Sequence, residues 1–294
     1  MSSQQSDLDG KRARGRQRLH RAARVQRALL AAHAWAVYLF LYTPILVLVL
    51  YSFNRSQRTA VWTGFTLDWY RHLLANRPIL RAVENSLVVA LATTAVTTVA
   101  GTLVALALAR FRFLGKGATQ AALYLPVIVP EVVIGAALVT FFGVARLRLS
   151  LATVIVAHVA FCLSYVAVVV RARLAGFERA LEEAAADLGA GAWDVFRRVT
   201  LPLIAPGILA GALLVFTVSL DDYVVTSFVA GVGSTTLPLQ IYSMLKVGVT
   251  PEVNAVSTLL LLVTIVLIAL AQRLQGQRLQ RPPESAPNPV EDSR

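Results

Sequence analysis

Six long apolar stretches, separated by short polar segments, dominate the pattern of this chain. A helix crosses a bilayer with roughly 20 mostly apolar residues, so each stretch predicts one membrane span. We therefore expect an all-α integral membrane protein with six transmembrane helices. The predicted spans are Trp35 to Phe53, Asn85 to Ala109, Ala118 to Phe142, Leu149 to Val170, Leu203 to Val229 and Val253 to Ala271.

The composition supports this interpretation and excludes a sizeable soluble domain. Of the 294 residues, 56% are hydrophobic and only 15% are charged, whereas soluble domains have about 45–50% apolar and about 25% charged residues. The first stretch is not predicted to be a cleaved signal peptide. It is too long, its basic flank is too extended, and no small-residue cleavage site follows it.

The distribution of charge predicts the orientation in the membrane. The net charge is +12, but 20 of the 28 Lys and Arg residues lie in the two termini and in the loops after the second and fourth spans. The positive-inside rule therefore places both termini in the cytoplasm. We interpret the basic run from Lys11 to Arg27 as an orientation signal that binds anionic lipid, in preference to a nucleic-acid site.

The chain is expected to have three parts. Residues 1–27 are expected to form a flexible basic cytoplasmic tail, residues 28–272 the six-span domain, and residues 273–294 a disordered cytoplasmic tail. The loop from Asn54 to Arg81 is expected on the outer side. Its aromatic residues favour an interfacial belt over a docking face for an extracytoplasmic partner; they are Trp62, Phe65, Trp69 and Tyr70.

Two spans carry residues that modify a plain helix. Pro126 and Pro130 lie four residues apart in the third span, ahead of Gly135, so they remove helix hydrogen bonds and predict a kink. Irregular backbone at membrane depth is tolerated only inside protein or beside a cavity, so this span is a candidate pathway wall. In the fifth span, Gly207 and Gly211 form a small-xxx-small face that predicts close helix packing.

The ionisable residues inside the spans are all acidic, and they are candidates for a substrate pathway. An ionisable group costs roughly 2.5–3.5 kcal/mol at the centre of a span on insertion scales, so such groups usually face a pathway. Glu131 follows the predicted kink, and Asp221 and Asp222 lie in the fifth span. Three acids fit a polyvalent cation, and the ring of Tyr223 suits an alkylammonium group. The alternatives are hydrogen bonds between spans for the acids and plain packing for Tyr223.

Neighbouring residues of a helix lie about 100° apart, so Asp221 and Asp222 are not expected to face the same way. We expect one of them to line the route and the other to cap or orient a neighbouring helix. No metal site or catalytic set is predicted. The lone cysteine, Cys162, is expected to pack in a span, the four histidines show no ligand spacing, and no acid is expected near His158 and Ser164.

The polar loop over residues 171–202 contains two predicted short helices. Leu181, Ala184, Ala185 and Leu188 form one apolar stripe, and Gly189 stands where a helix needs a residue of positive φ. A second short helix is expected to carry Trp193, Phe196 and Val199 on one side and to end at Leu201-Pro202. Such a segment is either a docking surface for a soluble protein or an ordinary amphipathic linker.

The same loop resembles the EAA loop of binding-protein-dependent ABC importer permeases, with Val199 where isoleucine is usual. The match lies in Glu183-Ala184-Ala185, Gly189, Val199 and Leu201-Pro202. Over residues 30–272 the chain is most similar to the second permease subunit of the spermidine/putrescine type. That likeness is carried by residues 48–54, 219–223, 235–238 and 247–255, and residues 157–162 and 165–169 point to the putrescine branch.

The resemblance implies an ABC type I importer permease fold in the bacterial inner membrane. It also implies a second permease subunit, two ATP-binding subunits and a periplasmic substrate-binding protein. Within the loop it implies that Glu183 reaches into a groove of the ATPase, that Ala184 and Ala185 permit close approach, and that Gly189 sets the angle between the short helices. The cargo implied is a polyamine, putrescine or spermidine.

No ATP-binding motif is found in the chain itself. Gly115-Lys116-Gly117 lacks the first glycine and the hydroxyl residue of a phosphate-binding loop, so we expect no cofactor here and no enzymatic activity, with ATP bound by the partner subunit. Two alternatives remain: a permease for another small organic cation, or a stand-alone secondary cation transporter. The second is weakened because no inverted repeat is evident.

Overall fold

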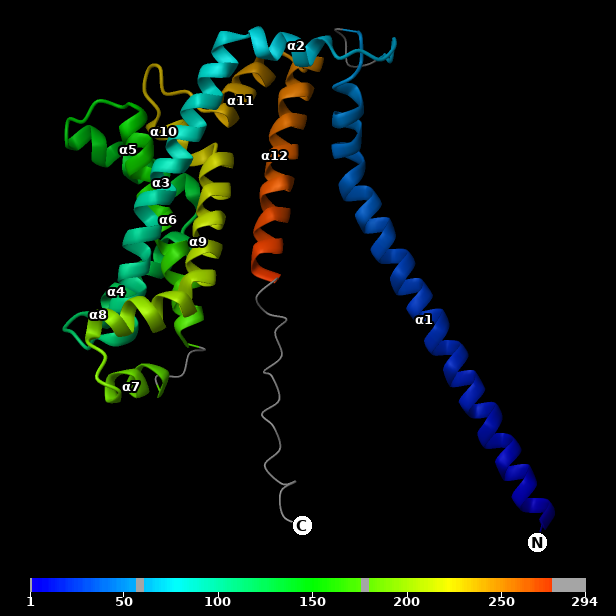
Figure 1. Cartoon of the computed structure of the whole chain (residues 1–294). Coiled ribbons are helices and arrows are strands. Elements are labelled where there is room, and N and C mark those ends of the chain that lie inside the picture. Colours follow the sequence, from blue (N-terminus) through cyan, green and yellow to red (C-terminus); the bar gives the residue numbers. More distant parts are fainter. Residues whose placement is uncertain (1, 57–60, 176–179, 277–294) are drawn as a thin grey trace, which may run out of the picture.

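The computed structural model describes residues 2–56, 61–175 and 180–276 and is almost entirely helical (Figure 1). In this part of the chain, five helices are long and apolar enough to cross a membrane, and the bent pair α4 and α5 makes a sixth span if it is counted as one. The predicted all-α architecture is confirmed. The helices are α1 (Ser2–Tyr51), α2 (Asp68–Ala75), α3 (Arg77–Arg110), α4 (Lys116–Ile128), α5 (Glu131–Val144), α6 (Leu151–Ala175), α7 (Ala180–Asp187), α8 (Ala192–Val195), α9 (Leu201–Asp221), α10 (Val224–Val229), α11 (Leu237–Val247) and α12 (Pro251–Gly276).

The spans α3, α6 and α9 pack together as the central bundle (Figure 1). Glycines allow the backbones to approach, because a Cβ on Gly101 of α3 would stand 2.8 Å from Val166 Cβ of α6. On α9, a Cβ on Gly211 would stand 3.3 Å from Val166 Cα, and one on Gly207 would stand 2.9 Å from Arg173 Cβ. The predicted packing face of the fifth span is therefore confirmed, and Cys162 is buried in the same core.

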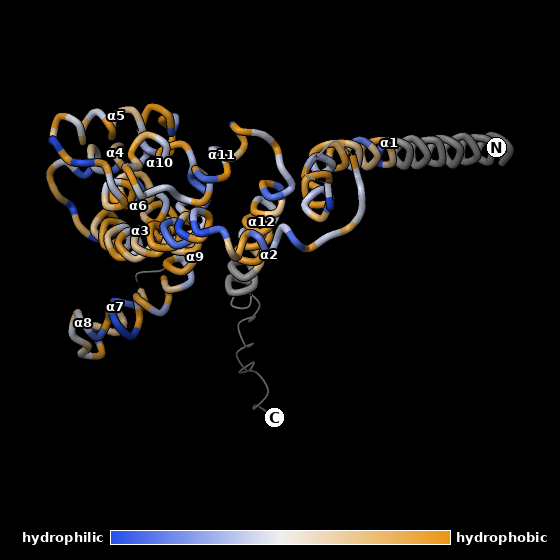
Figure 2. The backbone as a smooth tube through the Cα atoms, turned by 90° about the horizontal axis from the view of Figure 1, so that it is seen from above, coloured by the Kyte–Doolittle hydropathy of each residue, from blue (hydrophilic) through white to orange (hydrophobic). Residues whose placement is uncertain are grey.

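Helix α1 leans away from this bundle, whereas α12 lies beside α9 (Figures 1 and 2). α1 contacts α12, yet none of the most apolar window of Gln26–Tyr51 is buried. Figure 2 shows the apolar residues of this helix along a segment that leans away from the bundle. A large apolar face of α1 is thus left for lipid or for another membrane chain.

The ends of the spans differ from the predicted ones. α1 begins at Ser2, although residues 1–27 were expected to form a flexible tail. Ala, Arg, Leu and Gln favour helix, and no proline occurs before Pro44. α12 continues to Gly276, past the predicted start of the second tail at residue 273, and the remainder of that tail lies outside the described residues.

The second span begins eight residues earlier than predicted. Asn76 caps α3 by accepting a hydrogen bond from the backbone N–H of Ile79 at 3.3 Å, and Pro78 lies in the first turn. With 34 residues, α3 is about 50 Å long and exceeds the roughly 30 Å hydrocarbon layer. Asn76 also donates to Glu252 Oε1 at 2.9 Å, which ties the start of α3 to α12.

The third span is broken rather than kinked. α4 and α5 meet at 112° across Val129 and Pro130. Proline has no N–H and forces the preceding residue out of the helical region, and Val129 is extended, with φ −75° and ψ 132°. α5 then folds onto α10, where a Cβ on Gly135 would stand 2.5 Å from Phe228 Cδ2. The predicted proline kink is therefore present as a full break between two helices.

The fifth span also ends earlier than Val229, since α9 stops at Asp221 and α10 forms a separate short helix. The loop before α2 is compact, and its aromatic residues pack on one another. The rings of Phe53 and Phe65 stack at 5.3 Å, and Trp69 Nε1 donates to the Asn54 carbonyl at 2.8 Å. An interfacial role for this loop stays a prediction.

The close glycine contact predicts opposite effects of one methyl group at two helical positions. Gly101→Ala should lower the stability by about 1–3 kcal/mol, because the methyl group overlaps Val166. Gly143→Ala should raise it by about 0.5–1 kcal/mol, because no atom lies within 4 Å and alanine favours helix. Thermal unfolding in detergent measures both, and a shift in the same direction for the two variants would contradict this packing.

Candidate functional site: coupling loop and acidic cleft

Helix α7 and the turn after it have the geometry that the sequence predicts. α7 ends at Asp187, and Gly189 follows with φ +87°. The N–H of Gly189 donates to the Ala186 carbonyl at 2.9 Å, and the N–H of Ala190 donates to the Ala185 carbonyl at 3.1 Å. These bonds satisfy the last carbonyls of the helix. The predicted left-handed cap at Gly189 is confirmed.

The second half of the loop contradicts one prediction, because Leu201-Pro202 does not end a helix. α8 runs through a π-helical turn, Phe196–Thr200, directly into α9. The N–H of Leu201 donates to the Phe196 carbonyl, five residues back, and this wider turn accommodates the missing N–H of Pro202. The short helix and the membrane span are therefore one continuous rod.

The loop presents its apolar side chains to solvent rather than to its own chain. Leu188 is 90% exposed and Trp193 is 68% exposed, while Glu183 and Ala184 are also exposed. In Figure 1, α7 and α8 lie at the end of the bundle where α1 begins and α12 ends. This arrangement suits docking of another protein on the side of the two termini.

Glu182, the neighbour of Glu183, holds α7 against the spans. Its carboxylate accepts a short ion-paired hydrogen bond from Arg110 Nη2, at the end of α3. The same oxygen accepts from the hydroxyl of Thr200 at 2.5 Å, at the start of α9. The sequence motif marks Glu183 and not Glu182, since nothing local distinguishes two adjacent glutamates.

The two aspartates at the end of α9 have different environments. Asp222 is buried in the break between α9 and α10, where its carboxylate accepts from the backbone N–H and from the hydroxyl of Thr226, both at 2.8 Å. The N–H of Val225 adds a longer bond of 3.3 Å to Asp222 Oδ1. Asp222 thus caps α10, which otherwise has open N–H groups inside the membrane domain.

His158 of α6 completes this buried group. Its Nε2 lies 3.2 Å from Asp222 Oδ2 and 3.0 Å from Thr226 Oγ1, and its Nδ1 lies 2.7 Å from the hydroxyl oxygen of Ser219. The expectation that no acid stands near His158 was wrong, because 64 residues separate the pair in sequence. Ser164 is not among these partners. Full burial of the imidazole fits a structural network, with no access for a substrate.

Asp221 and Tyr223 are brought together in a different place. They line a cleft of about 390 Å³ between α9, α11 and α12. The Tyr223 ring lies 4.4 Å from the ring of Tyr242, and the Lys246 ammonium lies 4.8 Å from the Tyr242 ring centre. Tyr242 was not predicted, because it lies outside the predicted spans and its position beside Tyr223 depends on the packing of α11.

Glu131 is separate from this acidic cleft. It is the exposed first residue of α5, where a carboxylate interacts favourably with the helix dipole. It does not line the cleft of Asp221. A role for Glu131 in a pathway stays a prediction.

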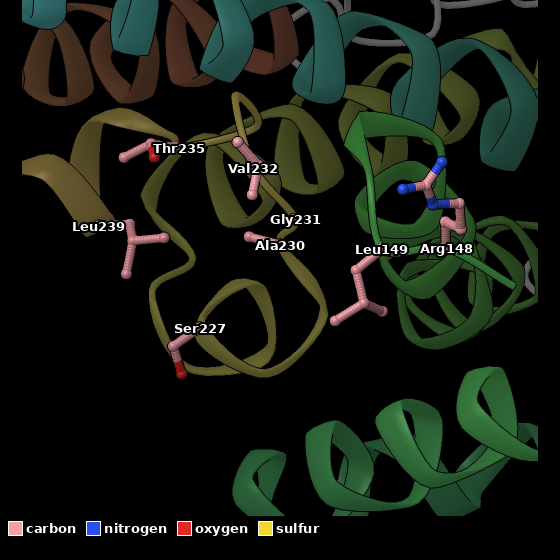
Figure 3. Close-up of a pocket in the computed structure, with 8 residues that line it drawn as sticks. All are labelled: Arg148, Leu149, Ser227, Ala230, Gly231, Val232, Thr235 and Leu239. Carbon is pink, nitrogen blue, oxygen red and sulfur yellow. The ribbon is translucent and has the colours of Figure 1, made fainter.

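A larger cleft of about 900 Å³ opens near the far end of the bundle from α7. Figure 3 shows Arg148 and Leu149 on one side of the segment 230–232, with Thr235 and Leu239 on the other. A neighbouring cleft of about 380 Å³ shares Thr235 and adds two arginines, Arg77 and Arg81. Three arginines therefore line these two neighbouring clefts.

A family comparison identifies the class of membrane protein to which the chain belongs. Residues 97–281, which include α7 and the rod of α8 and α9, match the model of the binding-protein-dependent transport system inner membrane component. The chain belongs to this family. It is therefore a multi-pass membrane permease, and docking of a soluble protein on the loop stays a prediction.

Individual relatives extend the match over most of the permease. This chain is 42% identical over 241 residues to the spermidine/putrescine transport system permease protein PotC of Haemophilus influenzae, and the match covers 82% of this chain and 94% of the relative. It is 41% identical over 252 residues to the putrescine transport system permease protein PotI of Escherichia coli, covering 82% and 90%. These relatives are transport permeases rather than enzymes. The two identities do not separate the two branches.

Solved structures agree on the fold. A bacterial ABC transporter that imports the acidic polysaccharide alginate gives a TM-score of 0.71 at 20% identity, covering 86% of this chain and 96% of that one. The methionine transporter MetNI in an inward-facing conformation gives a TM-score of 0.55 at 17% identity, covering 72% and 99%. The ABC importer permease fold expected from the sequence is confirmed.

The different environments of the aspartates predict different costs of removing them. Asp222→Ala should lower the stability by about 1–3 kcal/mol for each buried donor left unpaired, His158 and Thr226 among them. Asp221→Ala should change it by less than about 0.5 kcal/mol, because that side chain is exposed. Unfolding temperatures in detergent report both, and equal values would contradict the capping role of Asp222.

Proposed function

We propose that this chain is the permease subunit of an ATP-driven importer that moves polyamines from a periplasmic binding protein into the cytoplasm. The observation that carries the cargo assignment is the cleft that combines one exposed carboxylate with two tyrosine rings, those of Asp221, Tyr223 and Tyr242. The relatives named for spermidine and putrescine support the same class of cargo.

The chemistry of the cleft suits an alkylammonium group. A cation over the face of a tyrosine ring gains about 0.5–2 kcal/mol, and a nearby carboxylate adds attraction. The Lys246 ammonium already lies over the Tyr242 ring, so a cargo cation displaces it there or uses the ring of Tyr223. Asp222, whose oxygens accept three bonds from α10, is assigned a structural role.

The remaining subunits follow from the same proposal. Two ATP-binding subunits meet the exposed surface of α7 and α8, with Glu183 in their groove, and they bind the nucleotide that this chain does not. A second permease subunit joins this one in the bilayer, where α1 leaves an apolar face. The binding protein meets the opposite end, both termini lie in the cytoplasm, and the complex resides in the bacterial inner membrane.

Uptake of labelled putrescine by the reconstituted complex tests the cargo assignment. With saturating binding protein, Tyr242→Leu should reduce the uptake rate roughly 2- to 30-fold, the factor expected for one lost cation–π contact. Tyr242→Phe keeps the ring and should retain most of the uptake. Asp221→Asn should also reduce it. Wild-type uptake in both Tyr242→Leu and Asp221→Asn would remove the cleft from the pathway.

Copurification tests the docking surface. Glu183→Lys, which reverses an exposed charge, should abolish recovery of the ATPase subunits with the permease. Gly189→Pro should do the same, because φ +87° is inaccessible to proline and the cap is lost. Normal recovery of ATPase with both variants, or putrescine uptake by the permease alone, would favour a stand-alone carrier instead.

A further inference from the structure

Helix α7 is too weakly packed to be held by apolar contacts. It has eight residues and no buried side chain, and it contacts α8 and the π-helical turn. An isolated helix of this length is only marginally stable in water. A rigid position for α7 therefore requires a polar anchor.

Glu182 supplies this anchor at two points. Its carboxylate pairs with Arg110, and the two side chains are only 16% and 21% exposed. The same oxygen accepts the hydroxyl of Thr200 at 2.5 Å. Charge-assisted bonds in a partly buried place are stronger than exposed ion pairs, which contribute about 0–1 kcal/mol.

The two anchor points belong to different spans of the central bundle. Arg110 is the last residue of α3, and Thr200 immediately precedes α9. A displacement of α7 therefore acts on α3 through the ion pair and on α9 through the hydroxyl and the continuous rod. Glu183 follows Glu182 by about 100° around the helix, so one glutamate faces the spans and the other faces outward.

We propose that Glu182 is a positioning residue that transmits the movement of α7 to α3 and α9, while Glu183 serves docking. This inference rests on the proposed function, because it presumes an ATPase that moves α7. The three residues Arg110, Glu182 and Thr200 are termed the clasp below.

The test uses the complete importer in proteoliposomes with its binding protein. Glu182→Gln keeps the size of the side chain but removes its charge. The ATPase subunits should copurify at the wild-type ratio, while cargo transported per ATP hydrolysed should fall at least fivefold. Arg112→Gln removes an exposed charge two residues after Arg110 and outside α7; it is the matched control and should keep the wild-type ratio.

A second measurement reports the clasp without any cargo. A fluorophore on Leu188→Cys, a 90% exposed position, should show lower anisotropy in Glu182→Gln than in the otherwise wild-type chain. The exchange Arg110→Glu with Glu182→Arg reverses the pair and should restore both the anisotropy and more than half of the transport ratio. This double variant also tests the clasp if Glu182→Gln alone does not assemble with the ATPase subunits.

Each outcome decides the matter. Unchanged anisotropy and an unchanged transport ratio in Glu182→Gln overturn the clasp. If the ATPase subunits do not copurify with Glu182→Gln, and the double variant with reversed charges does not restore their recovery, Glu182 serves docking. That result also overturns the clasp. If the wild-type complex imports no polyamine, the proposed function is wrong. The anisotropy measurement needs no cargo and still tests the clasp in that case.

Discussion

The need to pair every backbone N–H and C=O group inside the membrane governs this molecule. An unpaired group in hydrocarbon costs several kcal/mol, so a helix that breaks at membrane depth needs a local replacement for its lost bonds. At the α9–α10 break, Asp222 supplies the acceptor and His158 holds it in place. At the α4–α5 break, Pro130 has no N–H that would need an acceptor.

The two breaks change the direction of the chain, whereas the π-helical turn preserves it. The breaks fold α5 and α10 onto each other through the contact of Gly135 with Phe228. Near Pro202 the chain instead absorbs the missing bond in a wider turn and keeps its direction. α9, with 21 residues, then spans about 30 Å from the coupling loop to Asp221. One rod connects the place where force is proposed to enter with the cleft proposed for the cargo.

Local features of the site were predictable from the sequence, and its pairings were not. The cap at Gly189 depends on positive φ directly after an apolar stripe, which is a local signal. The sequence did not indicate which of the two aspartates caps the next helix, because that depends on where α9 ends. Glu182, His158 and Tyr242 acquire their partners only through packing, and no spacing marks them in advance.

The sequence by itself determined the helical class, the apolar spans and the turn at Gly189, because these depend on hydrophobic length and on short local motifs. Tertiary structure decided where the fifth span breaks, which glutamate joins α7 to the bundle and which aspartate is exposed. Those outcomes rest on contacts between residues as far apart as Arg110 and Glu182. Such contacts form only when the helices pack, so the order of residues along the chain does not reveal them.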